Sequence, residues 1–256
     1  MDTEIDLNGT EVLRTGQLKK IHEEYSVVAL SARHIDQILA LKEVAFAHLR
    51  DGEQVYLANN KDRIFFEEHF SAGDAVIGIV HNGRLIAQGI IVNPTPARPE
   101  TGIAIEMDVP IETVAVLQGA IVHPDYRGNN LQAVLIDERI DVSVRNGRME
   151  IFSEVALGNS FSWGVLMKKG LHIESTGISP YTGAEVYVLR GHISRLRQPR
   201  KLRAKDSCAC PLTDVEQQKE LLAAGYKGTQ FDPAEKIITF ERAAATQRTA
   251  RNTPRP

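Results

Sequence analysis

The sequence predicts a mixed α/β fold in which helices cover both faces of one central sheet. Short apolar, β-branched runs typical of strands are separated by segments of helical periodicity. In the second half of the chain strands and helices alternate, which favours a mixed sheet. Of the 256 residues 43% are hydrophobic, enough for a sizeable core, and the net charge of -3 gives no reason to expect a nucleic-acid or membrane partner.

The first half predicts elements in the order β-α-α-β-β-β. Residues 1–24 are polar and predict a loose N-terminal arm. Asn82-Gly83 separates two apolar runs and signals a hairpin, because both residues tolerate the positive φ of a type I′ turn. The expected elements are strand Tyr25–Leu30, a helix from the Ser31 cap to Leu49, helix Lys61–Phe70, strands Ala75–Val80 and Leu85–Val92, a proline-bearing loop Asn93–Pro110 and strand Thr113–Val122.

The second half continues as α-β-α-β-β, with no apparent internal repeat. The expected elements are helix Asn129–Val144, strand Ile151–Ala156, helix Asn159–Lys169 and strands Leu171–Thr176 and Ala184–Leu189. The composition changes after His192, so we expect the main domain to cover residues 25–192. Residues 193–242 predict a basic linker and a small extension, with helix Asp214–Ala224 and strand Lys236–Phe240, and residues 243–256 a disordered tail.

The segment that carries chemistry lies where a buried strand ends at Pro124 and Gly128-Asn129-Asn130 opens a helix. Such a turn leaves backbone N–H groups unpaired at the positive end of the helix dipole, which suits a pyrophosphate. Gly128 lets the backbone approach the ligand closely, and Arg127 can add a charge-assisted contact to the pyrophosphate. Taken alone, an ordinary strand-to-helix turn with a surface arginine explains the same residues equally well.

The neighbourhood favours the anion site. Val122-His-Pro-Asp-Tyr-Arg-Gly-Asn-Asn-Leu-Gln132 resembles the signature of the GNAT superfamily of acyl-CoA N-acyltransferases, in which Val-x-Pro-x-Tyr precedes a pyrophosphate loop. Val155-Ala-Leu-Gly-Asn159-Ser-Phe-Ser162, followed by Lys169-Gly170-Leu171, resembles the family's second motif. The resemblance covers roughly Tyr25–His192 and implies a mostly antiparallel mixed sheet.

Three positions depart from the family pattern. Asn130 replaces the loop glycine, although Asn tolerates left-handed backbone better than most residues. Gln132 replaces a small residue and either crowds the diphosphate or hydrogen-bonds to it. Leu166 occupies the position where many members carry a tyrosine that protonates the leaving thiolate, so the usual general acid is missing.

The resemblance implies an acyl-CoA as co-substrate and direct attack by an amine on the thioester. The strands Thr113–Val122 and Ile151–Ala156 would splay, so that the pantetheine arm adds to a sheet edge and N–H groups near Ile121 or Val122 hold the carbonyl. The implied coenzyme-binding residues are Ile121, Val122, Arg127, Gly128, Asn129, Asn130, Leu131, Gln132 and Asn159. Asn159 also fits an ordinary N-cap.

Glu154 is the first candidate for the base that deprotonates an ammonium substrate, because partial desolvation at the strand end would raise the pKa of its carboxyl. A solvated or salt-bridged glutamate is the alternative reading. Ser162 or Tyr181 could protonate the thiolate, although each also fits a capping or loop role. His123 is expected to be exposed at the strand end.

Other features carry less weight in the prediction. The acidic loop residues Glu100, Glu106, Asp108 and Glu112 could shape a site for a cationic amine or simply be solvated. The basic run Arg195–Lys205 could contact RNA, an acidic partner or the coenzyme, or be solvated. Trp163 is expected to pack in its helix. Cys208 and Cys210 form neither a disulfide framework nor a metal site, which indicates a reducing, cytoplasmic setting.

Two functions remain open at the level of the sequence. The first is an N-acyltransferase, most simply an acetyltransferase, that transfers an acyl group from coenzyme A to a primary amine on a small molecule or peptide. The second is a non-catalytic acyl-CoA-binding or interaction module, which Leu166 and Asn130 favour. No metal is expected, nucleic-acid binding is a weaker third reading, and family members often form homodimers through exposed sheet edges.

Overall fold

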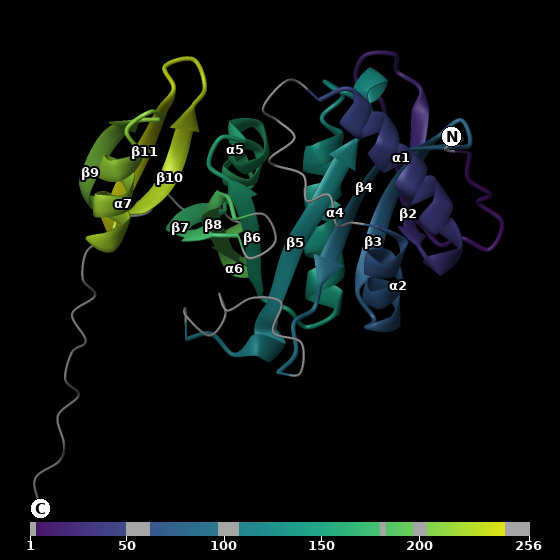
Figure 1. Ribbon diagram of the computed structural model, residues 1–256, viewed down its shortest axis with the longest axis horizontal. Helices are drawn as coiled ribbons and strands as arrows, with labels where there is room; N and C mark the ends of the chain where they lie inside the picture. Colours follow the sequence, from purple (N-terminus) through teal and green to yellow (C-terminus); the bar gives the residue numbers. More distant parts are fainter. Residues whose placement is uncertain (1–3, 50–61, 97–107, 180–182, 197–203, 244–256) are drawn as a thin grey trace, which may run out of the picture.

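The computed structural model describes residues 4–49, 62–96, 108–179, 183–196 and 204–243, and its strands form one eleven-stranded sheet (Figure 1). The order across the sheet is β1-β2-β3-β4-β5-β6-β8-β7-β10-β11-β9, and only the pair β5–β6 is parallel. The strands are β1 Val12–Gln17, β2 Glu24–Leu30, β3 Ala75–His81, β4 Arg84–Val92, β5 Val114–Val122, β6 Glu150–Ala156, β7 His172–Ile178, β8 Glu185–His192, β9 Ala204–Pro211, β10 Lys227–Asp232 and β11 Ile237–Ala243.

Helices cover both faces of this sheet, as the sequence predicts. They are α1 Ile35–Ala47, α2 Arg63–Ser71, α4 Leu131–Arg145, α5 Ser160–Lys168, α6 Ile193–Leu196 and α7 Val215–Ala223. Helices α1 and α2 pack on one face around a core that includes Ile38, Leu41 and Phe66. Helices α4, α5 and α7 pack on the other face, where the core includes Leu135 and Trp163 (Figure 1).

The prediction is wrong for parts of both ends of the chain. Residues 12–17, expected in a loose arm, form β1 and pair with β2. The expected basic linker is helical at Ile193–Leu196, and β9 begins at Ala204. Strand β11 extends to Ala243, which was expected in the disordered tail. Residues 197–203, residues 244–256 and most of the loop predicted before β5 lie outside the described residues.

The sheet also contains an internal repeat, which the sequence did not reveal. Strand β6, helix α5 and strands β7 and β8 form a first βαββ unit, with the spatial order β6-β8-β7. Strand β9, helix α7 and strands β10 and β11 form a second βαββ unit with the equivalent order β9-β11-β10. The expectation that the chain lacks a repeat is therefore wrong.

The two units match residue by residue around their helices. The N-caps Asn159 and Asp214, 55 residues apart, each accept a hydrogen bond from the backbone N–H three positions later. Gly170 and Gly225, also 55 apart, end the helices with φ of +94° and +82°. Both helix ends are closed by the same pair of backbone hydrogen bonds, a pattern typical of the Schellman motif.

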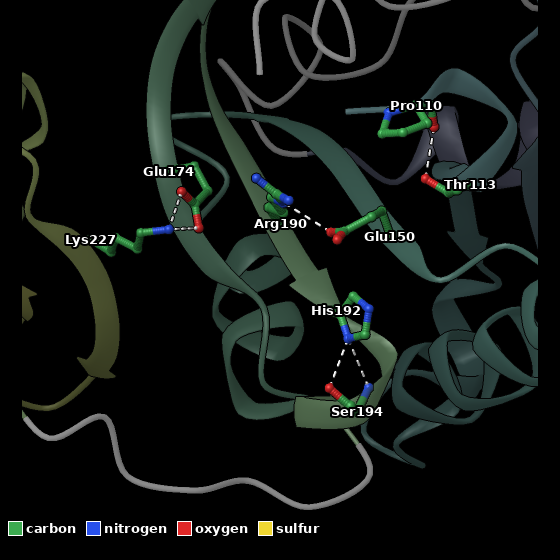
Figure 2. Close-up of polar contacts among 8 residues, drawn as sticks. All are labelled: Pro110, Thr113, Glu150, Glu174, Arg190, His192, Ser194 and Lys227. Carbon is green, nitrogen blue, oxygen red and sulfur yellow. Dashed lines mark hydrogen bonds and ion pairs between the residues drawn. The ribbon is translucent and has the colours of Figure 1, made fainter. Parts of the chain in front are cut away.

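The units meet edge to edge at β7 and β10. Ile173 pairs with Gly228, the residue 55 positions later, so the contact relates equivalent positions as a two-fold axis would. A Cβ at Gly228 would lie 3.0–3.3 Å from side-chain atoms of Ile173, tighter than most real contacts, which favours glycine there. Lys227 Nζ adds contacts of 2.7 and 2.6 Å to the Glu174 carboxylate, while Arg190 binds Glu150 within the first unit (Figure 2).

Candidate functional site

The parallel strands β5 and β6 separate after a short paired stretch. Residues 114–116 pair with residues 150–152, and both fully described strands continue beyond that point without pairing to each other (Figure 1). Ser153 Oγ donates to the Leu117 carbonyl at 2.9 Å where the separation begins. The sheet-edge groups of β5 beyond Leu117 are therefore not used by β6.

The chain turns sharply between β5 and α4. A 3-10 turn, Pro124–Tyr126, is followed by Gly128 at φ +84° and Asn130 at φ +66°. Asn130 thus adopts the left-handed conformation that the family pattern assigns to glycine. Its side chain makes no capping hydrogen bond, so it leaves the first-turn amides of α4 uncapped. Those amides lie at the positive end of a 15-residue helix, where an anion is favoured.

The hairpin between β1 and β2 holds this loop in place. The Lys20 backbone N–H donates to Asn129 Oδ1, and Lys20 Nζ donates to the Arg127 carbonyl, each at 2.8 Å. Asn129 is only 5% exposed and its amide also donates to the Tyr126 carbonyl at 3.0 Å. The Asn129 side chain therefore organises the loop, and the Lys20 ammonium lies beside Gly128.

The position of Lys20 was not predicted from sequence. A Cβ at Gly128 would lie 2.7 Å from Lys20 Cε and Nζ. The lysine is exposed, and its ammonium adds a positive charge beside the loop. Lys20 lies in a polar stretch 107 residues before Arg127, and neither its spacing nor its neighbours indicate the contact.

A second polar contact joins the starts of α4 and α5. Gln132 Nε2 donates to Ser162 Oγ at 3.0 Å, and the Ser162 N–H donates to Asn159 Oδ1 at 3.2 Å. The structure thus brings together the side chains of Gln132, Ser162 and Asn159, and the loop that begins at Arg127. Leu131 lies in the core, so only its backbone is available to a ligand.

Glu154 lies on the opposite side of the sheet from Ser162. It pairs with Val188 and shares a strand face with Phe152, both in the core beneath α1 and α2, whereas α5 packs on the other face. The Glu154 side chain is half-buried. The structure therefore separates the two residues predicted to be catalytic, one on each face of the sheet.

Three further expectations have definite outcomes. Leu166 is buried in the core and has no group that can donate a proton. Trp163 is fully buried, donates to the Leu157 carbonyl at 2.9 Å and contacts Tyr187 and Phe231, as expected for a core residue. His123 is 5% exposed, so its expected exposure is wrong, and burial is the main cause that lowers its pKa. Tyr181, Glu100 and Glu106 lie outside the described residues.

Within the described ranges, no cluster of three or more His, Cys, Asp or Glu side chains is arranged to hold a metal ion. No helix in that part of the chain is long and apolar enough to cross a membrane. Cys208 and Cys210 are free thiols on β9.

Comparisons with known proteins identify the fold. No known family profile and no curated relative match the sequence. Among solved structures, yncA of Salmonella typhimurium, with acetyl-CoA, matches with a TM-score of 0.50, 13% identity and 72% of this chain against 99% of that one. The GNAT domain of S. lividans PAT matches with a TM-score of 0.50 and 14% identity, over 74% of this chain and 99% of that one. An acetyltransferase candidate from Acinetobacter baylyi matches with a TM-score of 0.51 and 16% identity, over 69% of this chain and 97% of that one. The chain therefore has the fold of the GNAT acetyltransferases.

Proposed function

We propose that the protein is an N-acyltransferase that transfers an acyl group, most simply acetyl, from coenzyme A to a primary amine. The observation that carries the proposal is the separation of β5 from β6 beside the uncapped start of α4. An extended pantetheine arm can add to the open edge of β5, while the diphosphate binds the first-turn amides of the helix.

The coenzyme would contact one continuous stretch of described residues. The diphosphate would bind the backbone from Gly128 to Gln132, with positive charge from Arg127 and Lys20. Gln132, joined to Ser162, would border the path between α4 and α5. Asn159 would act on the coenzyme through the start of α5, because its side-chain oxygen already caps that helix. Ile121 and Val122 would border the pantetheine arm along β5, Val122 with its backbone N–H.

Transfer would proceed in a ternary complex. The amine nitrogen attacks the thioester carbon, the carbonyl electrons move onto oxygen, and collapse expels the coenzyme thiolate. Before attack, Glu154 would take a proton from the ammonium form of the acceptor, on the face of the sheet opposite α4 and α5, and so leave the neutral amine. Ser162 would protonate the thiolate through its hydroxyl, and the proton that the nitrogen loses as the amide forms would restore that hydroxyl. Positioning of the two substrates alone can supply roughly 7–11 kcal/mol.

The alternative is a GNAT-fold module that binds acyl-CoA without turnover. The observation that favours it is Leu166, which is buried at the position where many family members carry the tyrosine that acts as general acid. In this alternative the loop from Arg127 to Gln132 keeps its role, whereas Glu154 and Ser162 have none.

Calorimetric titration with acetyl-CoA, followed by a thiol-release assay over a panel of small-molecule and peptide amines, separates these outcomes. Saturable binding with amine-dependent thiol release supports the enzyme. Binding without release for any amine supports the module. Absence of binding to acetyl-CoA and to longer acyl-CoAs would remove both proposals and leave only the fold.

We also propose a cytoplasmic protein that requires no metal for transfer and binds neither membrane nor nucleic acid. The two free thiols support a reducing compartment. A homodimer is a further proposal, and light scattering at two protein concentrations tests it.

A further inference from the structure

Strand β5 contains a bulge where it leaves β6. Gln88 of β4 pairs with Ile121, and Ile90 pairs with Gln118, so one residue of β4 faces two residues of β5, Gly119 and Ala120. Gly119 has φ +58°, a conformation that favours glycine. The bulge lies beyond the last pair with β6, in the part of β5 where the thioester would bind under the proposed function.

A buried side chain fixes the orientation of one bulge peptide. Gln88 is fully buried, and its Nε2 donates to the Gly119 carbonyl at 2.9 Å. In a trans peptide the carbonyl and the following N–H point in opposite directions. Because Gln88 lies on β4, capture of the Gly119 carbonyl turns the Ala120 N–H away from β4 and its Gln88 side chain.

The hydrogen bonds after the bulge agree with this direction. The His123 N–H donates to the Ile86 carbonyl on β4 at 2.8 Å. Since alternate residues of a strand direct their backbone groups to the same side, the Ile121 N–H also points to β4. The Val122 N–H points the other way, on the same side as the Ala120 N–H. Of the two expected thioester donors, Ile121 is therefore turned toward β4, whereas Val122 and the bulge residue Ala120 face away from it.

Arg139 of α4 holds the other end of the bulge. Its Nη1 donates to the carbonyls of Ile90 and Gln118, each at 3.3 Å, and its Nε donates to the Leu135 carbonyl at 3.1 Å. Arg139 is 2% exposed, and burial lowers the pKa of its guanidinium to about 10. A Cβ at Gly89 would lie 3.0–3.1 Å from it, so the glycine provides its space.

The Gln88 amide is poorly explained by stability alone. Its Oε1 is buried without a hydrogen-bond partner among the described residues, an arrangement that costs free energy. The neighbouring inward residues of β4 on that face, Leu85 and Ile90, are apolar. A leucine at position 88 would leave no such orphan oxygen.

We propose that Gln88 is a positioning residue that aims the Ala120 N–H at the thioester carbonyl oxygen, with Arg139 holding the preceding peptide. The inference rests on the proposed acyl-CoA site and adds to it the residue that sets the donor. Without the Gln88 amide, the Gly119–Ala120 peptide is free to rotate, and the carbonyl of bound acetyl-CoA loses polarisation while the coenzyme stays bound through its phosphates.

The test uses the full-length protein and acetyl-CoA labelled with ¹³C at the carbonyl. Isotope-edited infrared spectra measure the carbonyl stretch of the bound thioester, and calorimetry measures its Kd. We expect a shift to lower frequency on binding to the wild type and loss of most of that shift in Gln88→Leu, with Kd changed by less than about threefold. If an amine substrate is found, kcat should fall about tenfold or more at nearly unchanged KM, because one oxyanion donor contributes about 10²–10³ in kcat.

Gln88→Glu provides a rescue that a purely structural role would not produce. A protonated carboxyl can donate to the Gly119 carbonyl, whereas a carboxylate cannot. Burial raises the pKa of such a carboxyl, so the infrared shift should return in this variant as the pH falls. Gln37→Leu, on α1, removes another amide whose oxygen is buried without a partner and should leave the spectrum unchanged.

The outcomes separate the inference from the proposed function. If the wild type does not bind acetyl-CoA, the acyl-CoA site itself is wrong. If the wild type binds and shifts the carbonyl but Gln88→Leu retains the full shift, the site stands and the role of Gln88 is overturned. If Gln88→Leu does not fold, the Gln88→Glu variant decides the question. A carbonyl stretch of bound acetyl-CoA that does not change with pH in this variant would also overturn the role of Gln88.

Discussion

The two βαββ units share one topology but border different neighbours. Helices α5 and α7 have the same length, equivalent N-caps and equivalent C-terminal glycines. The first unit presents β6 to β5 and α5 to α4, whereas β9 of the second unit is the terminal strand of the sheet. The unit alone therefore does not make the candidate site, which arises where the first unit meets a diverging strand and the start of another helix.

The largest expected effect is on stability, and it differs between the cores of the two units. Trp163 and Gln218 occupy equivalent positions, and both are fully buried. Trp163→Ala should lower the free energy of unfolding by about 3–5 kcal/mol because it empties a large volume between Tyr187 and Phe231. Gln218→Ala should cost about 1–3 kcal/mol because it leaves the buried Tyr187 hydroxyl without its partner. Urea unfolding measures both, and equal costs would show that the units are packed alike.

The next effect concerns ligand binding. Gly128→Val should raise the Kd for acetyl-CoA at least about 100-fold, equivalent to about 2.7 kcal/mol, because a branched side chain at φ +84° distorts the proposed anion loop. Gly225→Val, at φ +82° in the second unit, is the matched control and should strain the backbone without changing the Kd. Calorimetry decides: retained affinity in Gly128→Val would place the coenzyme elsewhere.

A smaller pair of changes compares the caps. Asn159→Ala and Asp214→Ala should each lower stability by about 1 kcal/mol, because each removes the acceptor for one helix-start N–H. Only Asn159→Ala should also weaken acetyl-CoA binding, since only α5 borders the candidate site. Thermal unfolding and calorimetry on both variants test this, and equal binding by the two would remove Asn159 from the coenzyme site.

The smallest expected effect is on pH dependence. Burial is the main cause that lowers the pKa of His172 at the start of β7 in the first unit, where the second unit has Lys227. The unfolded chain therefore takes up this proton first, so stability present above about pH 6.5 declines as the pH falls through and below that value. His172→Gln should flatten the decline measured by urea unfolding between pH 7 and pH 5. An unchanged slope would assign the acid sensitivity to other groups.

The sequence predicted the elements whose periodicity and turns are local. The Asn82-Gly83 hairpin, strand β5 and the turn into α4 follow from short patterns, and Asn130 tolerates the left-handed backbone that the loop needs. Strand β1 was missed because it is a mostly exposed edge strand that lacks an apolar face. The repeat was missed because its equivalent positions differ chemically, as Trp163 and Gln218 do.

The parts of the candidate site that depend on distant contacts could not be predicted. Lys20 reaches Arg127 only because the β1–β2 hairpin lies against the loop. The direction of the Ala120 N–H depends on a bulge whose position is set by pairing with β4, and on the Gln88 side chain. Spacing along the chain contains neither relation.

The contact between Ile173 and Gly228 has a consequence for association between molecules. At this point β7 already has a strand neighbour, and that neighbour is attached by the chain itself. Occupancy of this edge is therefore independent of protein concentration, and dilution cannot expose it. A second copy that adds by strand pairing must use β1 or β9, the outermost strands of the described sheet.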